Sequence, residues 1–236
     1  MIQNNKIAII TGASSGLGRS ISIKLALKGY EVVLASRNKE KLECLQKEIS
    51  GIGGVSKVVV TDVSKERDIE KLYLSIDVDK VDVVINNAGL GIFNKIQNIT
   101  TYEWDEQINI NLRGAFLMTK YISDSMIKRK KGKLIFINSV AGINAYPYSA
   151  AYVASKFGLR GLTSSLREEL REYNIKVISI HPGAVDTPFW NKAKVDFSRE
   201  DMLKSDDVAS SVVHAIFAPN NLVQEEIVIR RTKGDF

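Results

Sequence analysis

Cysteine and histidine are scarce in this sequence, which contains one cysteine and two histidines among 236 residues. The single cysteine, Cys44, excludes a disulfide within the chain and is typical of a reducing compartment. With so few sulfur and imidazole ligands, we predict no metal site. No stretch of about 18 apolar residues is present, so we expect no membrane-spanning helix. Residues Met1–Lys6 lack the order of a secretory signal, and we therefore expect a cytoplasmic protein.

The charge balance is basic, with a formal net charge of +6 and a pI of about 9.2. The basic residues are scattered among acidic ones, and the run Lys128–Lys131 stands at the expected end of a helix, where cations complement the helix dipole. Dispersed charge does not predict a nucleic-acid groove, so we expect no nucleic-acid partner. Some of the positive charge would instead suit an anionic cofactor.

Seven short apolar runs occur along the chain, at residues 7–10, 32–34, 58–60, 81–85, 134–137, 177–180 and 227–229. Stretches with helical periodicity separate them. Strands that are apolar without alternation are typical of a parallel sheet buried between helix layers. The sequence therefore predicts an α/β fold with a doubly wound, seven-stranded, mostly parallel sheet and helices on both faces. No repeat, low-complexity tract or linker is found, so we expect residues 1–236 to form a single domain.

The first apolar run leads into a glycine-rich turn that opens a helix. Its spacing is Gly-x-x-x-Gly-x-Gly, and its candidate cofactor-binding residues are Gly12, Ser14, Ser15, Gly16, Leu17 and Gly18. Glycines permit a tight turn and a close approach of the backbone to a ligand. The following helix start offers unpaired N–H groups and the positive end of its dipole. The turn alone is weak evidence, but its place between the first strand and the first helix predicts a pyrophosphate site.

The end of the second apolar run carries Ser36 and Arg37 where an NAD-specific fold usually places an acid. An arginine fork can bind a 2′-phosphate through charge-assisted hydrogen bonds, which favours NADP over NAD. The alternative is an ordinary surface arginine at a strand end. Asp62 and Val63, at the end of the third run, are placed to border the adenine, although Asp62 could equally be a helix-capping aspartate.

Together these features resemble the short-chain dehydrogenase/reductase family, from about Lys6 to Thr187. The resemblance depends on separate motifs in the expected order: the glycine-rich turn, Asn86-Asn87-Ala88-Gly89, Asn111, Ser139, Tyr152-x-x-x-Lys156, and Pro182-Gly183 with Thr187 beyond. Each motif is common by chance, and a Tyr-x-x-x-Lys spacing alone is typical of a tyrosine that packs on a lysine stem. The combination at these spacings is specific.

The resemblance implies four catalytic residues. Tyr152 would donate a proton to the carbonyl oxygen that accepts a hydride, and Ser139 would hydrogen-bond the same oxygen. A free tyrosine has a pKa of about 10, and the positive charges of Lys156 and the oxidised nicotinamide would favour its phenolate. Tyr152 and Lys156 would lie on one helix face because they are four residues apart. Asn111 would hold a water that joins Lys156 to bulk solvent.

The resemblance also implies further cofactor contacts, made by Asn87, Ala88, Gly89, Tyr152, Lys156, Pro182, Gly183 and Thr187. Substrate contacts are expected in the loops at the carboxyl ends of the strands. The candidates for the substrate pocket are Phe93, Asn144, Tyr146, Phe189 and Trp190. We expect a lid at about residues 187–205, with Thr187–Asp201 as its mobile part. His181 is interpreted as strand-end packing and His214 as structural.

The sequence thus predicts NADPH-dependent reduction of a ketone or aldehyde, a small-molecule carbonyl compound of 3-oxoacyl, diketone, pterin or 3-hydroxy acid type. The alternatives are an NAD-linked alcohol dehydrogenase and a non-catalytic sensor of the nicotinamide cofactor. Two departures from the family pattern matter. The C-terminus lacks the glycine-rich tail that helps tetramer packing, so a homodimer is as consistent as a homotetramer. Ser15 stands where many NADP users carry a basic residue, which leaves the 2′-phosphate to Ser36 and Arg37.

Overall fold

The seven apolar runs form one parallel sheet in the computed structural model, which describes residues 6–192 and 198–234. Neighbouring strands pair in the order β3-β2-β1-β4-β5-β6-β9, and every pair is parallel. The strands are β1 (Ile7–Thr11), β2 (Glu31–Ser36), β3 (Val55–Val60), β4 (Val81–Asn86), β5 (Gly132–Ile137), β6 (Ile175–Pro182) and β9 (Glu226–Ile229). The predicted doubly wound parallel sheet is confirmed.

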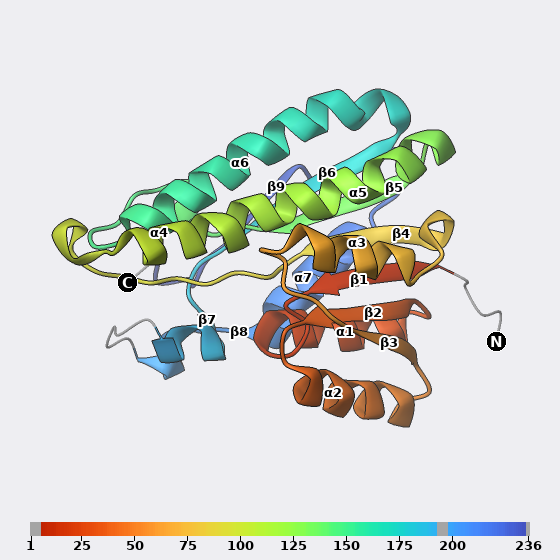
Figure 1. The fold of residues 1–236 in the computed structure, drawn as a ribbon, viewed down its shortest axis with the longest axis horizontal. Coiled ribbons are helices and arrows are strands. Elements are labelled where there is room, and N and C mark those ends of the chain that lie inside the picture. Colours follow the sequence, from red (N-terminus) through yellow and green to blue (C-terminus); the bar gives the residue numbers. More distant parts are fainter. Residues whose placement is uncertain (1–5, 193–197, 235–236) are drawn as a thin grey trace.

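Helices cover both faces of this sheet (Figure 1). On one face lie α1 (Gly16–Leu27), α2 (Lys39–Gly51) and α7 (Ser205–Ile216). On the other lie α3 (Glu66–Leu74), α5 (Gly114–Arg129) and α6 (Ala150–Leu170), with α4 (Thr101–Ile108) leading into α5. Successive residues of a strand point to opposite faces, so Ile10 packs in the core beneath α1 while Ile9 packs in the core beneath α5. The two cores therefore share the sheet as their common wall.

Two short features were not predicted. A two-residue strand, β7 (Val185–Asp186), pairs in parallel with another, β8 (Leu203–Lys204), because such short strands carry too little apolar pattern to be recognised. The helical stretches around α4 and α5 are joined by a π-helical turn at Asn109–Arg113. Of the expected lid at residues 187–205, residues 193–197 lie outside the described residues. Across the described ranges, no helix combines the length and the apolarity needed to cross a membrane.

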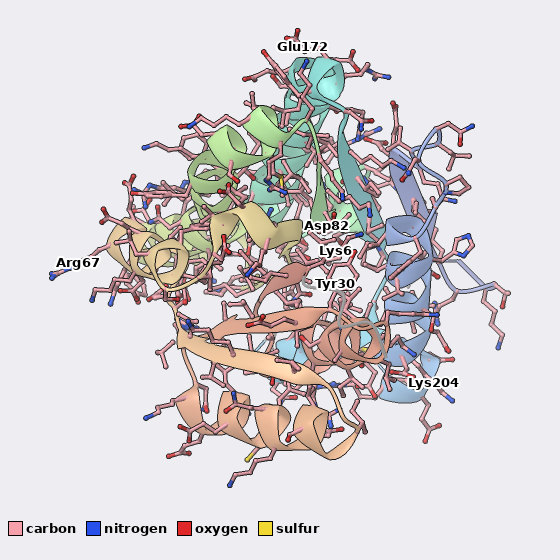
Figure 2. All side chains as sticks on the ribbon, turned by 90° about the vertical axis from the view of Figure 1, so that its right-hand side faces the viewer. Lys6, Tyr30, Arg67, Asp82, Glu172 and Lys204 are labelled. Carbon is pink, nitrogen blue, oxygen red and sulfur yellow. The ribbon has the colours of Figure 1, made fainter. Side chains whose placement is uncertain are left out.

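A buried ion-pair cluster holds the amino ends of the strands together. The carboxylate of Asp82 in β4 accepts a hydrogen bond from the Tyr30 hydroxyl at 2.6 Å. The ammonium groups of Lys133, Lys131 and Lys6 lie 3.5, 3.8 and 4.0 Å from the same carboxylate. Figure 2 shows Lys6, Tyr30 and Asp82 gathered from three distant segments. Burial opposes ionisation of Asp82, but the hydrogen bond from Tyr30 and the lysine charges outweigh it, so the Asp82 pKa lies below its usual value.

We expect Tyr30→Phe to lower the free energy of unfolding at pH 7 by about 1.5–3 kcal/mol, because it removes a hydrogen bond to a buried charge. The folded-state pKa of Asp82 is depressed, so the stability it contributes is present above its unfolded pKa and is lost as the pH falls through the folded value. The difference between wild type and variant should therefore shrink in acid. Urea unfolding at both pH values measures it, with the exposed Tyr102→Phe as control. Equal stability of the two variants would contradict this account.

Candidate active site

A cavity of about 720 Å³ lies at the carboxyl edge of the sheet, in the described part of the chain. Parallel strands end at the same edge, so the loops that follow β1 to β6 all contribute to its wall. Of the predicted site residues, all but Gly18, Asn111 and Asn144 line it. Segments separated by up to about two hundred residues in sequence thus meet at one cavity, as the motif order implied.

The glycine-rich turn forms one end of the cavity. Gly12 and Gly16 have φ values of +66° and +51°, a conformation that residues with a side chain rarely adopt. Gly18 lies behind the wall and not on it: a Cβ there would stand 2.5 Å from both the Asn87 Nδ2 and the Gly12 carbonyl oxygen. Helix α1 begins at Gly16, and Ser15 caps it without a side-chain hydrogen bond. Ser15, Gly16 and Leu17 line the cavity, so the start of this helix lies at the cavity wall.

Thr11 connects the ends of β1 and β4, the two neighbouring strands between which the strand order of the sheet reverses. Its Oγ1 accepts hydrogen bonds from the backbone N–H groups of Asn87 and Ala88, both at 3.0 Å. The Asn87 Nδ2 donates in return to the Thr11 carbonyl at 2.9 Å. These bonds fix the glycine-rich turn after β1 against the loop after β4. Thr11 stands just before the glycine-rich turn, and no role was predicted for it from the sequence.

The end of β2 presents a positive charge to the cavity. Arg37 is exposed, lines the cavity and has no ion pair within the described residues. Asp62 also lines the cavity, but its Oδ1 accepts hydrogen bonds from the backbone N–H and the hydroxyl of Ser64 at 3.1 and 2.7 Å. The capping role that sequence reasoning left open for Asp62 is therefore present, alongside a position on the cavity wall.

Helix α6 and the end of β5 bring three predicted catalytic side chains together. The Ser139 side chain lies close enough to the phenol of Tyr152 to lower the pKa of that phenol. The Lys156 ammonium lies 5.7 Å from the centre of the Tyr152 ring and donates to the Ile137 carbonyl at 2.9 Å. Lys156 is buried and Tyr152 is half-buried, one helical turn apart on the face of α6 that meets the cavity. The group combines a proton carrier, a hydroxyl and a cation.

The protonation of this group is set mainly by burial. Burial raises the pKa of Tyr152 to about 12, against the hydrogen bond with Ser139, which lowers it. Burial lowers the pKa of Lys156 to about 8. The Lys156 ammonium donates to the Ile137 carbonyl, and the expectation that Lys156 and the oxidised nicotinamide together favour the phenolate stays a prediction. At neutral pH Tyr152 holds its proton and Lys156 is charged.

Asn111 lies behind the cavity wall, in the π-helical turn between α4 and α5. Its side-chain oxygen accepts from the Leu90 N–H at 2.8 Å, and its amide donates to the Leu90 carbonyl and to the Ser155 hydroxyl, both at 2.9 Å. A Cβ on Gly89 would stand 3.3 Å from the Asn111 oxygen and 3.8 Å from the Lys156 nitrogen. Gly89 therefore separates Asn111 from Lys156, and Asn111 holds the loop after β4.

Aromatic rings line a further part of the cavity wall. The ring of Phe93 lies 5.4 Å from that of Tyr152, 6.4 Å from that of Phe189 and 5.9 Å from that of Trp190, centre to centre. Tyr146 also lines this part. Asn144 does not: its side chain is exposed, and its backbone N–H closes a short turn on the Val140 carbonyl. The prediction for Asn144 is corrected accordingly.

The C-terminal segment contributes residues that no motif indicated. Arg231 and Gly234 line the cavity, and the Arg231 Nε donates to the Gly234 carbonyl at 3.0 Å. A second nitrogen of Arg231 donates to the Asp201 carbonyl at 3.3 Å, which ties this segment to the expected lid. Glu106 of α4 lines the cavity as well. These residues could not be found from sequence because they stand outside the motifs. Among the described residues, no cluster of three or more His, Cys, Asp or Glu side chains could hold a metal ion.

Comparison with known proteins gives consistent matches over nearly the whole chain. A family model described as short chain dehydrogenase matches residues 6–196. A sepiapterin reductase of Chlorobaculum tepidum is 35% identical over 239 residues, which cover 97% of this chain and 97% of that protein. A crystal structure of a metagenomic short-chain oxidoreductase in complex with NADP is 32% identical, with a TM-score of 0.85 and 98% of each chain covered. An alcohol dehydrogenase from the archaeon Thermococcus sibiricus, complexed with 5-hydroxy-NADP, is 30% identical, with a TM-score of 0.88, and the match covers 96% of this chain and 97% of that one.

Proposed function

Because the chain belongs to the short-chain dehydrogenase family and is an oxidoreductase, we propose that it reduces the carbonyl group of a ketone or aldehyde with NADPH. The observation that carries this proposal is the grouping of Ser139, Tyr152 and Lys156 on the wall of a cavity that runs from a glycine-rich turn to a cluster of aromatic rings. A phenol that keeps its proton at neutral pH suits the reductive direction. Since both cores share one sheet, we treat residues 1–236 as one catalytic domain.

The residues at the glycine-rich end fit a dinucleotide phosphate cofactor. Gly12 and Gly16 give the turn a backbone conformation that residues with a side chain rarely adopt, and the start of α1 offers N–H groups for a pyrophosphate. Arg37 is free to pair with a 2′-phosphate, and no acid stands beside it at the end of β2 to repel one. Two similar solved proteins were determined with NADP or a derivative of it. Bound NADPH would supply the hydride.

The protein's own side chains would supply the proton and the polar contacts. Tyr152 donates its proton to the carbonyl oxygen, and Ser139 hydrogen-bonds the same oxygen as negative charge develops on it. The buried charge of Lys156 stabilises the phenolate that remains on Tyr152. Asn111 does not contact the reacting groups in this proposal. Its two hydrogen bonds to Leu90 hold the loop after β4, which passes between Asn111 and Lys156.

The substrate end of the cavity favours an uncharged, partly hydrophobic carbonyl compound. Phe93, Phe189 and Trp190 contact one another, and Phe93 and Phe189 also contact Tyr152, so the three rings can surround a flat or apolar group next to the reacting oxygen. Ketones of the diketone, 3-oxoacyl and pterin side-chain types fit this description, and one relative is named a sepiapterin reductase. Residues 187–205, which include Phe189 and Trp190, would act as the lid.

We also propose that the chain forms a homodimer or homotetramer through α5 and α6. Phe116 on α5 and Phe157 on α6 are 46% and 43% exposed, and the two helices run side by side on one face of the molecule (Figure 1). Large apolar side chains on adjacent helices are typical of a surface that is covered by a second copy.

Tyr152→Phe should abolish carbonyl reduction while leaving NADPH binding within about twofold, because the change removes the transferable proton and leaves the ring in place. Steady-state turnover with a panel of ketones and a fluorescence titration with NADPH measure the two properties. Tyr148→Phe is the matched control, since Tyr148 also lines the cavity but is largely exposed and stands outside the Ser139–Lys156 group. Turnover that survives in Tyr152→Phe would exclude the mechanism.

Arg37→Ala should remove a preference for NADPH over NADH. We expect the wild type to bind NADPH at least about tenfold more tightly, a difference of about 1.4 kcal/mol, and the variant to bind both alike. Titration of each protein with both cofactors gives the four dissociation constants, with Arg67→Ala on α3 as a control. If the wild type binds NADH as tightly as NADPH, an NAD-linked alcohol dehydrogenase becomes the better description.

Phe116→Glu should dissociate the assembly, because it places a charge in an apolar contact between chains. Sedimentation velocity is expected to show a wild-type mass of two or four chains and a variant mass near that of one 26.2 kDa chain. Leu27→Glu provides the control, since Leu27 is 64% exposed on α1, which covers the opposite face of the sheet. A monomeric wild type would refute the proposed interface.

A further inference from the structure

His181 lies directly behind the turn that carries Ser139. It belongs to the carboxyl end of β6, next to β5, and its side chain has no solvent exposure. Its Nδ1 is 3.1 Å from the backbone carbonyl oxygen of Ser139. The sequence suggested only strand-end packing for this residue. The contact instead links its ring to the residue whose side chain lies beside Tyr152 on the cavity wall.

The Ser139 carbonyl oxygen determines which nitrogen of the His181 ring carries the proton. A carbonyl oxygen only accepts hydrogen bonds, so Nδ1 must carry the hydrogen and donate it. Burial lowers the pKa of His181, which keeps the ring neutral. The other nitrogen, Nε2, is then a buried acceptor, and it has no hydrogen-bond partner in the described part of the chain. A buried acceptor without a partner costs stability, so the residue is not explained by packing alone.

The Ser139 turn is anchored at its start by Asn138, whose backbone N–H donates to the Ile180 carbonyl of β6 at 2.8 Å and whose side-chain amide donates to the Lys156 carbonyl at 3.2 Å. The Ser139 hydroxyl oxygen accepts from the Ala141 N–H at 3.0 Å, and its carbonyl accepts from the Gly142 N–H at 2.9 Å. Both of these bonds lie within the turn and would move with it. The bond from His181 is different, because it ties the Ser139 carbonyl to a neighbouring strand of the rigid sheet. The carbonyl and the hydroxyl both belong to Ser139. A hydrogen bond that fixes the carbonyl therefore limits the directions in which the hydroxyl can point.

We propose that His181 is a positioning residue for the proposed reaction: it holds the Ser139 carbonyl and thereby aims the Ser139 hydroxyl at Tyr152 and the substrate oxygen. The inference rests on the proposed catalytic role of Ser139. It assigns to His181 neither proton transfer nor substrate contact. Loss of its bond leaves the turn attached to β6 through the Asn138 N–H and the Ile180 carbonyl, so the protein folds while the hydroxyl loses its fixed direction.

Two amide variants separate this role from a structural one. The side-chain nitrogen of Asn is attached to Cγ, as is Nδ1 of histidine, so His181→Asn keeps a donor near the Ser139 carbonyl. The nitrogen of Gln is one atom further out, as is Nε2, so His181→Gln loses that donor. We expect kcat to fall about tenfold or more in His181→Gln, with the NADPH dissociation constant unchanged, and to return to within about threefold of wild type in His181→Asn. His214→Gln, at the other histidine and exposed on α7, is the control.

A double-mutant cycle with Ser139→Ala decides whether His181 acts through Ser139. Once the hydroxyl is gone its direction no longer matters, so adding His181→Gln to Ser139→Ala should lower kcat by less than about twofold further. Thermal melting of all four proteins confirms that each is folded. An undiminished effect of His181→Gln in the Ser139→Ala background, or an equal loss in His181→Asn, would overturn the inference. An unchanged kcat in Ser139→Ala alone would instead overturn the proposed role of Ser139.

Discussion

The parallel direction of the seven strands is the constraint on which the site depends. Because all of them end at the same edge, loops that are distant in sequence meet around one cavity. The strand order reverses between β1 and β4, which leaves a crevice where no crossover helix can cover the edge. The hydrogen bonds between Thr11 and Asn87 span this crevice and hold the glycine-rich turn in place. The loops that follow β1 and β4 can form a cofactor site there, because both loops start from strands that are fixed in the sheet.

The chemistry is concentrated where β5 meets α6. Consecutive residues at the end of β5 contact the helix: Ile137 accepts from the Lys156 ammonium, and Asn138 donates to the Lys156 carbonyl at 3.2 Å. Ser139 follows, and its side chain lies close enough to Tyr152 to lower the pKa of the phenol. The sheet thus sets the distances among a buried cation, a protonated phenol and a hydroxyl. Burial raises the pKa of the phenol and lowers that of the lysine, which keeps the proton available for donation at neutral pH.

Much of this arrangement could be predicted from the sequence. Non-alternating apolar runs identified all seven strands of the sheet, and the order of the motifs placed Ser139, Tyr152 and Lys156 at one edge. Features without a local pattern could not be predicted, because they depend on contacts between distant segments. Arg231 reaches the cavity only through the path of the C-terminal segment. Asn144 looked like a wall residue from its place in a loop, yet the turn closed by its own N–H leaves its side chain exposed.

The central claim is that a hydride passes from NADPH to a carbonyl carbon while Tyr152 protonates the oxygen. Its most direct test is a reduction with NADPH that carries deuterium at the transferable position of its nicotinamide ring, with an aromatic diketone as acceptor. Mass spectrometry of the product alcohol should show one deuterium on the carbinol carbon for each NADPH consumed. Consumption of NADPH without deuterium in the alcohol, or no alcohol from any carbonyl compound tried, would contradict the account.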